Sequence, residues 1–186
     1  MCDEFTLQET EKHLKGISRR RFNSMALGTA FALSLPPVAN ALAVTSTDVE
    51  IKTVDGSCDA VFVHPAEGNY PAVIMWPDIL ALRPAFRTMA NRLAESGYAV
   101  LCVNPYYRDA KAPVVEVGES FQDAFTREKV MPMYRNLSAT THHKDAMAFV
   151  AWLDANSVVD TNRKIGTMGY CMGGPIIMRT AAAAAD

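Results

Sequence analysis

The stretch that most constrains how this 186-residue chain can fold is Gly169-Tyr170-Cys171-Met172-Gly173. It fits the pattern glycine, any residue, nucleophile, any residue, glycine, in which a strand turns sharply into a helix and presents the central side chain. Glycines flank such a turn because side chains there would collide with the neighbouring backbone. A strand pattern at 163–168 and a helix pattern from Pro175 onward favour this elbow over a glycine-rich turn that holds an ordinary buried cysteine. The dipole of that helix would favour the thiolate form of Cys171.

Composition indicates one globular domain and argues against several classes of protein. Hydrophobic residues make up 49% of the chain, which is enough for one core, and the formal net charge is −2. A charge this small predicts no nucleic-acid partner. The four cysteines show neither a disulfide framework nor a metal-ligand spacing, so we expect no metal and no cofactor.

Residues 1–43 have the features of an export signal. Ser18-Arg19-Arg20-Arg21-Phe22 precedes the apolar run Met25–Leu35, and small residues follow at Ala41-Leu42-Ala43. This order is typical of a signal peptide, and the paired arginines resemble a twin-arginine signal. We expect cleavage after Ala41 or Ala43, and delivery to the periplasm by the twin-arginine export machinery. The apolar run is shorter than the roughly 20 residues that a spanning helix needs, so no stable membrane anchor is expected. The alternative is an uncleaved amphipathic helix.

Residues 44–186 predict one α/β domain that begins with an antiparallel hairpin, whose turn lies at Asp55-Gly56. Unbroken apolar runs indicate parallel strands buried on both faces, and a helix between two of them makes a right-handed βαβ unit. The expected strands are 48–54, 58–63, 70–76, 98–103 and 163–168. The expected helices are 84–96, 121–129, 142–156 with Thr141 as its cap, and 175–185.

This order of elements resembles the first part of an α/β-hydrolase, and specifically the dienelactone hydrolase family. Three stretches carry the likeness: AVIMWPDI at 72–79, YAVLCVNPYYR at 98–108 and GYCMGG at 169–174. The likeness runs from about Asp48 to the last residue. It implies a mostly parallel sheet flanked by helices, preceded by the antiparallel hairpin.

The resemblance also implies a small-molecule ester or lactone substrate and a role for each matching residue. Cys171 would be the nucleophile, and the backbone N–H groups of Ile79 and Met172 would form the oxyanion hole. Asp78 stands where the family has a glutamate that holds the resting thiol, with a side chain one methylene shorter. Arg108 would pair with a carboxylate of the substrate, for which the guanidinium fork is suited.

One departure from the family pattern concerns the rest of the catalytic triad. In α/β-hydrolases an aspartate and then a histidine follow the nucleophile, whereas 172–185 contains neither residue type. The resemblance therefore implies a C-terminally truncated domain, and we expect such a part to be unstable, with an exposed strand edge, and inactive. His142 and His143 are alternative candidates for the base, against a capping or solvated role, and Asp145 is expected to be solvated.

Other functions remain open on the sequence alone. A broad carboxylesterase or thioesterase would use the same elbow without needing Arg108. An exposed thiol at a helix N-terminus also suits an oxidation sensor. A fragment without catalytic activity is the third alternative.

Overall fold

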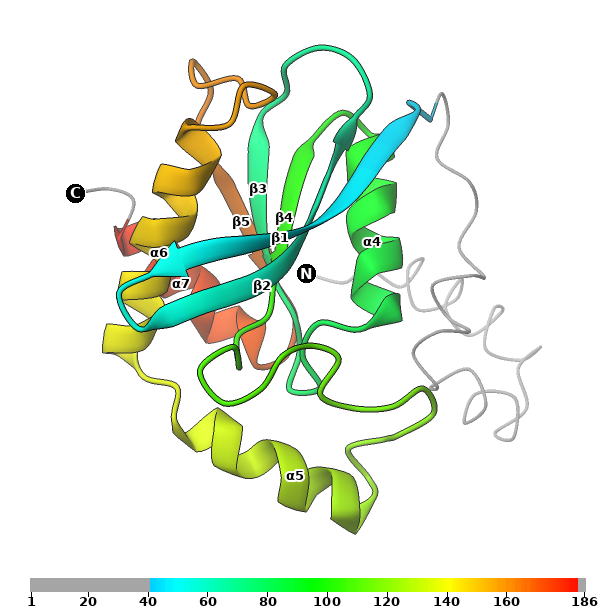
Figure 1. Cartoon of the computed structure of the whole chain (residues 1–186), viewed down its shortest axis with the longest axis vertical. Coiled ribbons are helices and arrows are strands. Elements are labelled where there is room, and N and C mark those ends of the chain that lie inside the picture. The colour runs from blue at the N-terminus through cyan, green and yellow to red at the C-terminus, as the bar shows by residue number, and fades with distance from the viewer. Residues whose placement is uncertain (1–40, 184–186) are drawn as a thin grey trace, which may run out of the picture. The chain divides into compact units, whose positions relative to one another are not determined.

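The computed structural model describes residues 41–183 (Figure 1). The expected export signal lies outside the described residues, apart from its last three positions. Two of these already join the domain, because the Leu42 N–H donates to the Glu95 carbonyl and the Ala43 carbonyl accepts from Ala66 N–H.

Five strands form one mixed sheet in the order β1-β2-β4-β3-β5. Their bounds are β1 Val44–Thr53, β2 Gly56–Pro65, β3 Ala72–Trp76, β4 Ala99–Val103 and β5 Gly166–Gly169. The hairpin β1–β2 is antiparallel, and β2 also pairs antiparallel with β4, whereas β4, β3 and β5 run parallel. The predicted α/β-hydrolase-like architecture, with its N-terminal hairpin, is thereby confirmed.

The sequence explains why β3 and β4 lie in the middle of this sheet. All five residues of each strand are buried, as expected for apolar runs covered on both faces. Gly56 supplies the backbone of the hairpin turn with a φ of 144°, which side-chain-bearing residues rarely adopt. β5 forms the edge of the sheet opposite β1, and within the described residues it pairs only with β3.

Helices cover the two faces of the sheet (Figure 1). These are α4 Pro84–Glu95, α6 Ala139–Asp154 and α7 Gly173–Ala183, whereas α5 Ala124–Arg135 lies beyond one end of the sheet. On one face, Phe86 and Ala90 of α4 pack with buried residues of β2, β3 and β4. On the other face, Phe149 of α6 and Ile176 of α7 pack around Trp76. Burial of these apolar side chains supplies the main stabilisation of the domain.

Two helices differ from their predicted bounds by three residues or more at one end or both. α6 begins at Ala139 because Ser138, and not Thr141, is its N-cap: each of the two side chains accepts a hydrogen bond from the backbone N–H of the other. α5 ends six residues later than predicted and passes through Pro132. Its Val130 and Met133 pack in a third buried cluster, and this tertiary packing outweighs the local preference against proline.

Candidate active site

The turn between β5 and α7 has the geometry expected of an elbow. Cys171 lies there with a φ of 51° and an exposed side chain. A Cβ at Gly169 would lie 2.6 Å from the Gly173 carbonyl oxygen, and a Cβ at Gly173 would lie 2.5 Å from the Trp76 carbonyl oxygen. Only glycine fits either position, and the two contacts force the chain to reverse at Cys171. Such a left-handed conformation is costly for a residue with a side chain and is typical of functional positions.

Two backbone donors lie in the segments around this thiol. The Met172 N–H follows Cys171 directly, and the Ile79 N–H belongs to the loop between β3 and α4. Neither group donates to an acceptor within residues 41–183. Unpaired backbone donors in the segments around an exposed thiol suit an anionic oxygen of a substrate.

Tyr106 joins these two segments, a role that sequence reasoning did not predict. Its side chain is 0% exposed. The hydroxyl donates to the Ile79 carbonyl at 3.0 Å and lies 3.2 Å from the Met172 sulfur. The pKa of Tyr106 is raised, first by burial and then by the charge of Asp78, so that the group stays a hydroxyl donor.

Asp78 is committed to its own loop. Its carboxylate receives both ends of the Arg83 guanidinium, at 2.6 and 2.9 Å, and the Leu80 N–H at 3.0 Å. Among the described residues, the Cys171 thiol makes no hydrogen bond to this carboxylate. In this structure Asp78 and Arg83 therefore fix the loop that carries Ile79, and the expected contact with the resting thiol is not formed.

Arg108 is placed in a network of acidic side chains. Its Nη1 and Nη2 bind the two carboxylate oxygens of Asp145 at 2.9 and 2.6 Å, while Nε and Nη2 bind Asp55 at 3.2 and 2.8 Å. The guanidinium also lies over the Tyr107 ring, 4.4 Å from its centre. Four of its five N–H groups are used in this way. A substrate carboxylate could bind Arg108 through two N–H groups only by displacing Asp55 or Asp145.

Asp145 is buried, so the prediction that it is solvated is wrong. Its residue is 1% exposed, and it accepts from the Tyr107 hydroxyl at 2.7 Å as well as from Arg108. The helix pattern of the sequence placed Asp145 on a solvated face. The residues that cover it come from the end of β4, which helix periodicity cannot reveal.

His142 is also buried, with 4% of its surface exposed, whereas His143 is exposed. The Nδ1 atom of His142 lies 2.8 Å from Nη1 of Arg179. A guanidinium only donates, so Nδ1 accepts and a neutral ring must carry its proton on Nε2. Nε2 is buried without an acceptor among residues 41–183. Burial, with the charges of Arg179 and Arg108, lowers the pKa of His142 to about 4. A general base needs a free lone pair, and the Nδ1 lone pair of His142 is engaged by Arg179.

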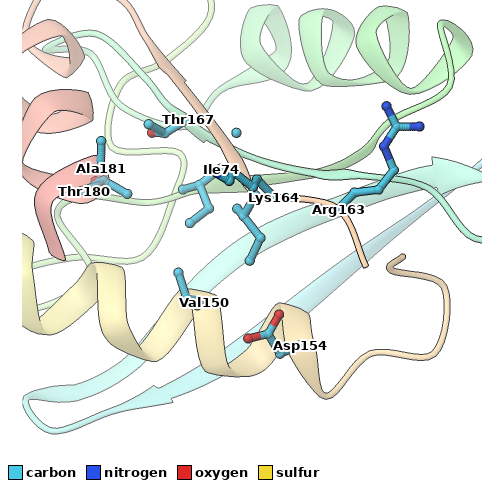
Figure 2. A pocket seen from close by; sticks show the side chains of 10 residues that line it. Ile74, Val150, Asp154, Arg163, Lys164, Thr167, Thr180 and Ala181 are labelled. Atoms are coloured by element: carbon cyan, nitrogen blue, oxygen red, sulfur yellow. The ribbon is translucent and has the colours of Figure 1, made fainter. Parts of the chain in front are cut away.

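Two cavities border both α6 and α7. One cavity, of about 360 Å³, is lined by residues that include Met172, Ser138, His142 and Arg179. The other, of about 600 Å³, lies between α6, α7 and β5, where the side chains of Ile74, Asp154 and Thr167 face it (Figure 2). This second cavity contains none of the predicted site residues.

The described residues offer no cluster of histidine, cysteine or carboxylate side chains arranged to bind a metal ion. Within the same range, every helix is too short or too polar to span a bilayer.

Comparisons with known proteins agree with the fold. The sequence profile of the dienelactone hydrolase family matches residues 58–186. A carboxymethylenebutenolidase of Pseudomonas putida is 25% identical over 135 residues, which cover 72% of this chain and 55% of that protein. A candidate carboxymethylenebutenolidase of Methylorubrum extorquens is 27% identical over 168 residues, which cover 86% of this chain and 55% of that protein.

Solved structures show the same architecture. A dienelactone hydrolase-like promiscuous phosphotriesterase from metagenomic libraries superposes with a TM-score of 0.58 at 24% identity, covering 75% of this chain and 54% of that one. At this identity the likeness concerns the fold alone. The chain spans about half the length of the curated relatives that it matches.

Proposed function

The chain belongs to the dienelactone hydrolase family, and from that premise we propose that the protein hydrolyses ester or lactone bonds of a small molecule with Cys171 as the nucleophile. The observation that carries this proposal is the elbow itself. An exposed thiol with a φ of 51° precedes α7, and the two glycines beside it admit no side chain.

The proposed reaction proceeds in two steps. The Cys171 thiolate attacks the carbonyl carbon, a C–S bond forms, and the carbonyl oxygen becomes an oxyanion held by the Met172 and Ile79 N–H groups. Collapse of this intermediate breaks the C–O bond, and the leaving oxygen takes the proton that the base removed from the Cys171 thiol. Water then hydrolyses the thioester and regenerates the thiol.

The proton transfers need a base that the described residues do not supply. His142 has its lone pair engaged by Arg179, and the exposed His143 makes no hydrogen bond to Cys171. The base and its partner carboxylate are therefore expected from a part of the whole protein outside residues 41–183.

The test is to substitute Cys171 in the protein expressed from its complete gene. Cys171→Ala should abolish hydrolysis of a 4-nitrophenyl ester, and Cys171→Ser should leave a trace because a hydroxyl needs a stronger base than a thiol does. Cys102→Ala is the matched control, since that buried thiol lies in β4 and takes no part in the reaction. Full activity in Cys171→Ala would mean that the elbow is not the reaction centre.

A further inference from the structure

The two proposed oxyanion donors come from segments far apart in the sequence. Ile79 follows β3, whereas Met172 lies immediately before α7, 93 positions later. A tetrahedral oxyanion is stabilised only when both N–H groups lie about 3 Å from it at the same time. Some contact must therefore fix the separation of the two segments.

The loop that carries Ile79 is already fixed on one side. The Asp78 side chain accepts from the Leu80 N–H, the Asp78 carbonyl accepts from the Ala81 N–H, and Arg83 binds the Asp78 carboxylate. These contacts are internal to the loop. They set its shape, but they do not set its distance from the elbow.

On the basis of the function proposed above, we propose that Tyr106 is a positioning residue that sets the distance between the two halves of the oxyanion hole. Its hydroxyl donates to the Ile79 carbonyl at 3.0 Å and lies 3.2 Å from the Met172 sulfur. The thioether is a weak acceptor, so the carbonyl bond fixes the hydroxyl and the sulfur packs against it.

Tyr106 is itself held rigidly. Its residue is 0% exposed, and its backbone N–H donates to the Asn104 side chain at 3.0 Å. The Asn104 amide also binds Asp59 of β2 at 2.9 Å and the Ala110 carbonyl at 2.8 Å. The tyrosine is thus anchored to the sheet, and it transmits that rigidity to both donor segments.

The chain offers a matched control in the next residue. The Tyr107 hydroxyl lies 2.8 Å from Thr53 Oγ1 and donates to Asp145 at 2.7 Å, so it bonds the hairpin and α6 and does not reach the elbow. Tyr107→Phe removes the same atom as Tyr106→Phe from a neighbouring position. A general effect of losing a buried hydroxyl would appear in both variants.

The experiment compares Tyr106→Phe with Tyr107→Phe in the protein as made from its gene, with a 4-nitrophenyl ester as substrate. We expect Tyr106→Phe to lower kcat roughly 10- to 100-fold with KM nearly unchanged, since a small misplacement of catalytic groups is enough for such a loss. Affinity for a trifluoromethyl ketone, which forms a tetrahedral adduct with the thiol, should fall by the same factor. Tyr107→Phe should change neither quantity.

Each outcome decides the proposal. Unchanged kcat and unchanged ketone affinity in Tyr106→Phe would overturn it, and so would an equal loss in the two variants.

If Tyr106→Phe does not fold, Met172→Leu tests the same contact, because it removes the sulfur and keeps the backbone donor. A lower kcat at constant KM in Met172→Leu supports the proposal, and an unchanged kcat contradicts it. Failure of the function itself would appear separately, as activity that survives Cys171→Ala.

Discussion

The imidazole of His142 is held neutral by its position between α6 and α7. Burial and the neighbouring charges of Arg179 and Arg108 lower its pKa to about 4. In the unfolded chain the same group should titrate near its ordinary value of about 6.5. Between these two pH values the unfolded state binds more protons than the folded state, so the free energy of unfolding decreases as the pH falls through this window.

We predict that His142→Gln flattens this acid dependence. The wild-type protein should lose up to about 3 kcal/mol of stability between pH 6.5 and pH 4 through this group, and the full contribution should be present above pH 6.5. Urea denaturation at pH 7 and pH 5 measures how much the free energy of unfolding changes between these two pH values. His143→Gln is the control because that side chain is exposed. Equal pH slopes in the wild type and His142→Gln would show that His142 is not the titrating group.

At the scale of elements, Arg108 joins three parts of the fold. It follows β4, binds Asp55 in the β1–β2 turn and binds the buried Asp145 of α6. Lys144 of α6 reaches the same Asp55 at 3.1 Å. Removing one partner of a buried ion pair leaves the other charge unpaired, which costs about 3–5 kcal/mol. The network therefore stabilises the packing of the hairpin against α6.

We predict that Arg108→Gln lowers the free energy of unfolding by an amount in that range, measured by urea denaturation. Arg163→Gln, which removes the same charge from an exposed position, should change it little. The anchor role implied by the family resemblance makes a different prediction. A rise in KM for an anionic ester, without a similar rise for its neutral methyl ester and without loss of stability, would support that role over the structural one.

Local patterns predicted most elements because the residues that determine them are close in sequence. The apolar runs gave β3 and β4, Asp55-Gly56 gave the hairpin turn, and the glycines beside Cys171 gave the elbow. The start of α6 was missed because Ser138 and Thr141 bond reciprocally, and either residue alone looks like a cap. α5 was predicted too short because its last turns depend on packing with distant residues.

Within the candidate site, the contacts that the sequence did not reveal all join distant segments. Tyr106 meets Ile79 and Met172, Asp145 meets Arg108, and His142 meets Arg179. A single sequence carries no signal for such pairs beyond the residue types themselves. The role of a tyrosine or a buried carboxylate is set by its partners in the fold.

At the scale of the whole molecule, β5 is the outer strand of the described sheet. Its second edge carries backbone groups that no described strand pairs, and an edge of this kind is a template for association with another chain. The expectation that residues 44–186, expressed alone, are insoluble or molten stays a prediction. Size-exclusion chromatography with light scattering measures it, and a monodisperse monomer would contradict it.

The destination of the molecule is a separate prediction, because residues 1–40 lie outside the described part of the chain. We propose export to the periplasm by the twin-arginine route, on the basis of Arg19-Arg20 and the apolar run that follows. Replacing both arginines by lysine should abolish export of a fused reporter. Unchanged export of that variant would exclude the twin-arginine route while leaving a general signal peptide possible.

Because the cysteines differ in burial, chemical labelling of thiols can measure the fraction of folded molecules. Cys58 and Cys102 are buried, and burial raises the pKa of both thiols, whereas Cys171 is exposed. A polar maleimide should therefore attach once to the native domain between residues 41 and 183, and three times after denaturation. The ratio of the two mass increments reports the fraction of molecules in which Cys58 and Cys102 stay buried, without any knowledge of the substrate.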